Sequence, residues 1–127
     1  MKFQEWIQNK PMPKNKREAY QLLFDYILDL SEKKDLDYSP QNIGLYGELG
    51  VAVRVGDKAM RLKSLLVDKR VQRVNDESVE DTWFDLTNYG LIAVMLRHNW
   101  WLELDWGNNQ EKTQPEKPEV DREAPVE

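Results

Sequence analysis

The sequence contains no cysteine and one histidine, and it has no long apolar run. The absence of cysteine excludes disulfides, zinc–thiolate sites and cysteine nucleophiles. No stretch of about 18 apolar residues occurs, so the sequence predicts no transmembrane helix. Residues 1–13 also lack the apolar segment of a signal peptide. We therefore expect a cytoplasmic protein that does not enter a membrane.

The chain also lacks an excess of positive charge, because 18 Lys and Arg residues face 23 Asp and Glu residues, for a net charge of −5. Binding to the nucleic-acid backbone needs a dense basic patch, so direct DNA or RNA binding is disfavoured. The glycine-rich phosphate-binding motifs of P-loop and Rossmann proteins are missing. Ser39, Ser64 and Thr82 have no nearby histidine partner, which leaves a Ser-His-Asp arrangement without support.

The apolar residues suffice for one domain with a single core, since they make up 40% of 127 residues. They recur at helical spacing in three segments, and no segment has a strong strand pattern. These segments are residues 15–34, 41–69 and 76–97. The sequence therefore predicts an all-α fold, a small bundle of three main helices in a domain that spans residues 14–106.

Both ends of the chain differ from this bundle. Residues 1–13 are predicted to be an N-terminal arm whose Phe3, Trp6 and Ile7 dock on the body. Residues 35–38 break the first helical pattern. The tryptophan-rich segment after His98 is expected to pack back on the bundle, as a helix extension or an extended segment. Residues 107–127, rich in Pro, Glu and Lys, predict a disordered acidic tail.

The third helical segment carries an unusual polar face. Four side chains fall within roughly 80° of one another, and the stripe then becomes apolar at Ile92 and Met95. The four are Glu77, Asp81, Asp85 and Asn88. Carboxylates at the edge of a core need a counter-ion, either a divalent metal or basic side chains from a neighbouring helix. The alternative, an exposed first turn that complements the helix dipole, suits Glu77 but not Asp85, which lies deeper in the helix.

The second helical segment supplies complementary charges. Arg54, Asp57, Lys58 and Arg61 lie within roughly 100° of one another and could hold a polyphosphate and one metal ion. Two alternatives remain: a solvated face with an Asp57–Arg61 pair, or a salt-bridge network between helices without any ligand. Glu48 falls on the core side of a regular helix, so it is either displaced by the nearby glycines or an inward metal ligand.

Aromatic residues and the histidine complete the candidate set. A nucleoside ligand would need an aromatic wall, for which Trp83, Tyr89 and Trp101 are candidates, although the tryptophans also suit a core or a lid. His98 follows Arg97 at a predicted helix C-terminus, where histidine is commonly a dipole or capping partner and less commonly a general base.

Two segments together resemble a known family. Tyr46-Gly-Glu-Leu-Gly-Val-Ala-Val-Arg-Val-Gly-Asp-Lys-Ala-Met-Arg-Leu62 and Glu77-Ser-Val-Glu-Asp-Thr-Trp-Phe-Asp-Leu-Thr-Asn-Tyr-Gly-Leu-Ile-Ala93 look like the type-one nucleotide modification associated domain of phages and bacteria. That family is associated with phage nucleotide metabolism or DNA-base modification. It is distantly similar to the MazG-like all-α nucleoside triphosphate pyrophosphatases, which hold Mg²⁺ on paired acidic motifs and commonly form oligomers.

The resemblance implies a metal-dependent nucleotide-binding protein in the cytoplasm of a phage's host. Its enzymatic form would be a (d)NTP pyrophosphatase that uses Mg²⁺ or Mn²⁺. The implied roles are catalytic for Asp81 and Asp85, metal-ligating for Glu48, Asp57, Glu77, Asp81 and Asp85, and substrate-binding for Arg54, Lys58, Arg61, Asn88 and Tyr89. In place of the family relatives' Glu-x-x-Glu, the second segment has Glu48 and Asp57. A homo-oligomer is expected. The alternative function is a non-catalytic phage accessory protein that binds a host partner.

Overall fold

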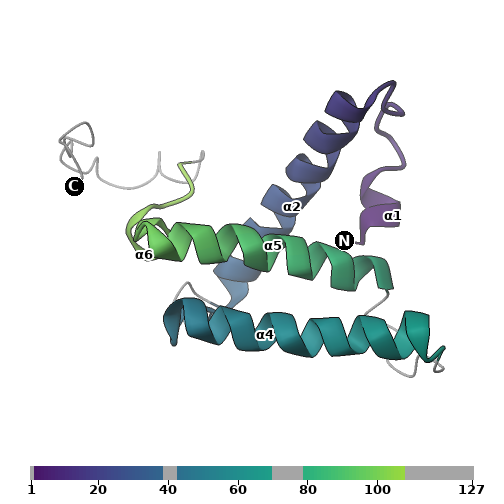
Figure 1. The fold of residues 1–127 in the computed structure, drawn as a ribbon. Helices are drawn as coiled ribbons and strands as arrows, with labels where there is room; N and C mark the ends of the chain where they lie inside the picture. Colours follow the sequence, from purple (N-terminus) through teal and green to yellow (C-terminus); the bar gives the residue numbers. More distant parts are fainter. Residues whose placement is uncertain (1, 39–42, 70–78, 108–127) are drawn as a thin grey trace.

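The computed structural model describes residues 2–38, 43–69 and 79–107, and this part of the chain is all-α (Figure 1). Its helices are α1 (Phe3–Trp6), α2 (Lys16–Tyr38), α4 (Gly47–Leu62), the π-helix η1 (Lys63–Val67), α5 (Val79–Arg97) and α6 (Trp100–Glu103). Three of them are long, so the predicted all-α fold with three main helices is confirmed. No helix in the described ranges is long and apolar enough to cross a membrane.

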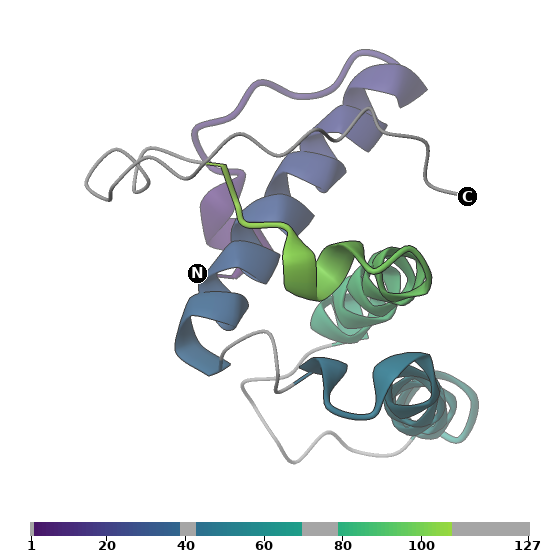
Figure 2. The ribbon, with the colours of Figure 1, turned by 90° about the vertical axis from the view of Figure 1, so that its left-hand side faces the viewer.

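Helix α5 lies at the centre of the structure. Helix α4 runs antiparallel beside it (Figure 1), and Figure 2, which looks along both axes, shows α2 crossing next to them. Val51 and Leu62 of α4 are 1% and 7% exposed and share the face turned to α5, as their spacing of three turns requires. Helix α5 packs against both α4 and α2.

The core consists of two clusters at different positions along α5. Around Phe84, the first cluster joins α5 to Tyr26 and Ile27 of α2. Around Ile92, the second cluster joins α5 to Val51 of α4 and Trp101 of α6. The two turns of α5 between Phe84 and Ile92 carry the polar residues that form the candidate site.

The N-terminal arm docks on the first core cluster, as predicted. The Phe3 ring lies 5.0 Å from both the Tyr26 ring and the Phe84 ring, and the Trp6 ring lies 5.3 Å from Tyr26. The Trp6 indole donates a hydrogen bond of 3.0 Å to Asp29 Oδ2. The short helix α1 thus covers the junction of α2 and α5 with aromatic rings.

Two predicted boundaries are wrong. Residues 35–38 do not break the first helix, because α2 continues to Tyr38, and the indole of Trp106 donates to the Asp35 carboxylate at 2.8 Å. The second segment was predicted as one helix over 41–69 with a start disturbed by its glycines; the start is disturbed, but the segment does not continue as one α-helix. Helix α4 begins at Gly47, whose φ of +61° suits a residue without a side chain, and the chain changes to a π-helix at Lys63. Of the predicted tail over residues 107–127, residues 108–127 lie outside the described part of the chain.

Burial of Tyr26 gives the fold a pH dependence. Tyr26 is 3% exposed, and burial, with the nearby carboxylates of Asp81, Glu80 and Asp85, raises the pKa of its phenol above the usual 10.0. Above about pH 10 an unfolded tyrosine loses its proton while the folded one keeps it, so the free energy of unfolding falls as pH rises. Between pH 8 and pH 10.5, Tyr26→Phe should lose less stability in urea denaturation than Tyr20→Phe, a control at a 67% exposed site. Equal losses in the two variants would contradict this assignment.

Candidate functional site

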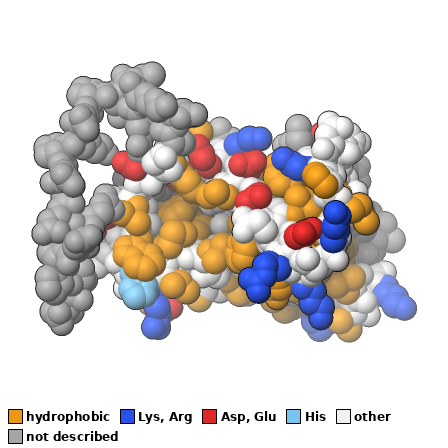
Figure 3. Space-filling view, turned by 90° about the horizontal axis from the view of Figure 1, so that it is seen from above, with side chains coloured by type: hydrophobic (Ala, Val, Ile, Leu, Met, Phe, Trp, Pro, Cys, Tyr) orange, Lys and Arg blue, Asp and Glu red, His pale blue; other side chains and the backbone are white. Residues whose placement is uncertain are grey.

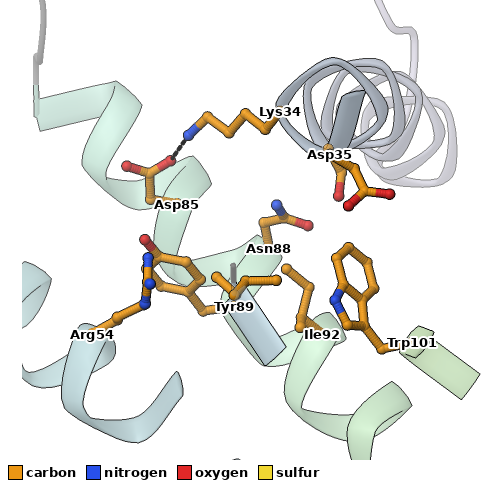
Figure 4. Close-up of a pocket in the computed structure, with 10 residues that line it drawn as sticks. Lys34, Asp35, Arg54, Asp85, Asn88, Tyr89, Ile92 and Trp101 are labelled. Atoms are coloured by element: carbon orange, nitrogen blue, oxygen red, sulfur yellow. Dashed lines mark hydrogen bonds and ion pairs between the residues drawn. The ribbon is translucent and has the colours of Figure 1, made fainter. Parts of the chain in front are cut away.

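A cavity of about 330 Å³ lies where α2, α4, α5 and α6 meet (Figure 4). This volume is at the lower end of the range typical of small-molecule sites. Its lining residues are Ser31, Lys34 and Asp35 from α2, Ile43, Arg54 from α4, Asp85, Asn88, Tyr89 and Ile92 from α5, and Trp101 from α6. The lining therefore combines cations, carboxylates, an amide and aromatic rings.

Helical spacing explains why these residues share one space. On α5, the lining residues Asp85, Asn88, Tyr89 and Ile92 follow one another at intervals that place them on one face. On α2, Ser31 and Lys34 continue the face that carries the buried Ile27. Along the chain, the core-facing stripe of α2 thus changes from apolar to polar at the cavity, whereas that of α5 changes from polar to apolar.

Asp85 is the electrostatic centre of the site. It is 9% exposed, and both of its carboxylate oxygens are bound by lysines from different helices. Lys34 Nζ of α2 lies 2.8 Å from Oδ1, and Lys58 Nζ of α4 lies 3.2 Å from Oδ2. The predicted counter-ion from a neighbouring helix is thus present as two ammonium groups around one carboxylate. This cluster carries a net positive charge.

The opposite side of the cavity holds polar atoms for which the described residues supply no hydrogen-bond partner. Asn88 is 6% exposed, and its amide makes no hydrogen bond to any residue that the structure describes. Asp35 Oδ2 accepts the Trp106 indole hydrogen bond, whereas Asp35 Oδ1 is enclosed and has no hydrogen-bond partner in the described part of the chain. Buried polar groups are rarely left unpaired, because each one costs desolvation free energy. These atoms are therefore candidates for contact with a ligand.

Aromatic rings form the walls between these two sides. Trp101 is 7% exposed and lies edge-on to Trp106, with ring centroids 6.2 Å apart. Tyr89 also lines the cavity. The prediction that Tyr89 and Trp101 could flank a ligand thus fits their positions, whereas Trp83 is 53% exposed and is not part of the lining.

The five predicted substrate-binding residues divide into three groups. Arg54, Asn88 and Tyr89 line the cavity. Lys58 does not line it but binds Asp85. Arg61 lies on α4 and does not line the cavity. Four of the five are therefore brought to one place, directly or through Asp85.

The five predicted metal ligands are not brought together to the same extent. Glu48 is directed to the surface, where its carboxylate accepts from Arg97 Nε at 2.7 Å, and Asp57 is exposed. Asp81 lies 3.9 Å from Lys2 Nζ, and Glu77 lies outside the described residues. In the described ranges, no three His, Cys, Asp or Glu side chains are placed to share a metal ion. A magnesium site stays a prediction.

Sequence reasoning missed the contribution of α2. Ser31, Lys34 and Asp35 were not predicted as site residues because the run from Glu32 to Asp35 looks like a solvated, helix-ending segment. The signal that could have found them is the helical spacing of Ser31 and Lys34 from Ile27, a clear core position. His98 stacks on Trp100 with centroids 4.5 Å apart and does not line the cavity.

Comparisons of this chain with family models, curated proteins and solved structures found no match. The resemblance to the nucleotide modification associated domain family therefore stays a prediction. The functional argument rests on the cavity itself.

Proposed function

We propose that this protein binds a nucleotide, a (d)NTP, in the cavity between α2, α4, α5 and α6. One observation carries the proposal. The Asn88 side-chain amide, which has no hydrogen-bond partner among the described residues, shares a cavity of about 330 Å³ with the two lysine-bound oxygens of Asp85. A nucleotide has the matching two ends, a hydrogen-bonding base and a polyanionic phosphate chain. We also propose that the chain belongs to the nucleotide modification associated domain family, on the strength of the two motifs that resemble it.

The phosphate end of such a ligand would meet the cations. Lys34, Lys58 and Arg54 come from two helices, while Asp85 supplies a single negative charge among them. Arginine and lysine side chains bind phosphate through charge-assisted hydrogen bonds. Lys34 has a side chain that is 47% exposed, so it can turn from Asp85 to a phosphate without a change of backbone.

Magnesium enters this proposal together with the nucleotide. Proteins commonly hold Mg²⁺ through one or two carboxylates and the phosphates of the substrate, without a complete protein cage. Asp81 and Asp85 lie one turn apart on α5 and are the carboxylates that would contribute. Bound there, the ion would neutralise phosphate charge and activate water, the chemistry of a (d)NTP pyrophosphatase.

Thermal melts with a (d)NTP panel, with and without Mg²⁺, test the proposal. A ligand that binds only the folded state should raise stability by about 2.7 kcal/mol at 100 times its Kd, a shift of several degrees. Lys34→Ala should reduce this shift. Lys33→Ala is the matched control, because Lys33 is the adjacent lysine on α2 and its side chain is exposed and does not line the cavity. Flat melts across the panel would contradict the proposal, and pyrophosphate release would distinguish an enzyme from a binding protein.

A second candidate function is supported by the surface. The outer face of α4 carries Leu49, Val53 and Met60 at 80%, 67% and 61% exposure, spaced to form one stripe. The face seen in Figure 3 carries further apolar side chains near the histidine, at the α6 end of the molecule. Contiguous exposed apolar surface commonly marks a protein interface. These surfaces favour an accessory protein that binds a host partner, or a homo-oligomer that buries the α4 stripe.

A further inference from the structure

The Asn88 end of the cavity has the chemistry of a recognition site. Asn88 is 6% exposed and has no hydrogen-bond partner among the described residues. Figure 4 shows its amide directed into the space between Lys34 and Asp35. An amide offers a donor and an acceptor side by side, so a complementary ligand presents an acceptor next to a donor. The amide alone does not say which group binds it.

Asp35 restricts the chemical groups that a ligand can present at this end of the cavity. Its Oδ2 is already bound by the Trp106 indole at 2.8 Å, and its Oδ1 is closed to solvent with no hydrogen-bond partner among the described residues, so a ligand reaches Oδ1 once the carboxylate turns toward the cavity. An ionised carboxylate only accepts hydrogen bonds, so the group that satisfies Oδ1 is an N–H or O–H donor. A carbonyl oxygen placed against Asp35 would be repelled. The ligand therefore needs a donor on the side that faces α2.

The walls indicate a flat ligand. Trp101 and Tyr89 line the cavity next to Asn88, and aromatic rings of this kind favour stacking or edge contacts with a planar heterocycle. A ring nitrogen next to an exocyclic amino group gives Asn88 both of its partners, as asparagine does with adenine. The second N–H of the same amino group is then available to Asp35.

We propose that this end of the cavity recognises the amino face of a nucleobase, 6-aminopurine or 4-aminopyrimidine, in preference to the oxo bases. This inference rests on the proposed function, because it assigns the base of the nucleotide bound there. The amino group donates to Asn88 and Asp35, while the adjacent ring nitrogen accepts from the Asn88 amide. Hypoxanthine and uracil place a carbonyl oxygen where the amino group would be.

Calorimetric titration with matched nucleotide pairs tests the inference. The pairs are dATP with deoxyinosine triphosphate, and dCTP with dUTP, which differ at the amino or oxo position. In each pair the amino form should bind about tenfold or more tightly. Asp35→Asn should reduce this ratio, since an amide can also donate to an oxo group. Asp29→Asn is the control, because Asp29 accepts an indole hydrogen bond from Trp6 at 3.0 Å but does not line the cavity.

The outcomes separate this inference from the function it rests on. Equal affinities within both pairs would overturn the inference while leaving nucleotide binding in place. No binding by any of the four nucleotides would overturn the proposed function and the inference with it. The comparison within each pair uses the unaltered protein, so it holds even where Asp35→Asn unfolds the chain.

Discussion

Asp85→Ala is expected to lower the free energy of unfolding by about 2–4 kcal/mol. The substitution removes the carboxylate that binds both Lys34 and Lys58 and leaves two ammonium groups at a site that is largely closed to water. Breaking a buried ion pair by removing one partner typically costs about 3–5 kcal/mol. The lower value here reflects Lys34, whose 47% exposed side chain can turn to solvent, whereas Lys58 at 21% has less freedom. Urea denaturation at neutral pH measures the loss.

The control for Asp85 is Asp57, an exposed carboxylate on α4. Asp57→Ala should change stability by no more than about 0.5 kcal/mol, as surface substitutions commonly do. Lys58→Met should cost less than Asp85→Ala, because Asp85 would keep Lys34 at 2.8 Å. An Asp85→Ala variant as stable as the Asp57→Ala control would show that the lysine-bound carboxylate does not hold α2 and α4 against α5.

Phe84→Ala is expected to cost about 3–5 kcal/mol, the range for removing a large aromatic ring from a core. Phe84 is 8% exposed, and its ring lies 4.7 Å from Tyr26 and 5.0 Å from Phe3. The cavity left behind would lie between α5, α2 and the N-terminal arm. Phe24→Ala, at a 46% exposed site on α2, is the matched control and should have a much smaller effect. Chemical denaturation of both variants gives the comparison.

The same substitution should also loosen the arm. Phe3 and Trp6 reach the core through aromatic contacts with Phe84 and Tyr26. In Phe84→Ala, the Trp6 indole N–H should exchange faster with solvent, because its bond to Asp29 would be held less firmly. An unchanged exchange rate would show that the arm is held by Tyr26 alone.

The helices were largely predictable because their apolar residues follow a strong helical period. The docking of Phe3 and Trp6 followed from their apolar character, shared with Ile7, in the N-terminal arm. The pairing of Asp85 with Lys58 was predictable as well, since a carboxylate at the edge of a core needs a cation and α4 offers several. These features depend on spacing within one helix or on simple charge complementarity.

The remaining features depend on how the helices are arranged. Lys34 and Asp35 enter the site because α2 crosses beside α5 and continues past the apparent break, and periodicity alone gives no crossing angle. Glu48 turns to Arg97 because α4 begins only at Gly47. The prediction that Glu48 faces the core assumed a regular helix that already extends before Glu48. The switch to a π-helix at Lys63 has no signal in the sequence pattern that we can identify.

The central claim, that a nucleotide occupies the cavity, is tested most directly by amide and indole NMR resonances during titration with dATP and dCTP. We expect the Asn88 side-chain amide and the Trp101 indole to shift in a saturable way, because both residues line the cavity. The indole of Trp83, 53% exposed and outside the lining, should stay unchanged. Constant Asn88 and Trp101 resonances at millimolar nucleotide would contradict the account.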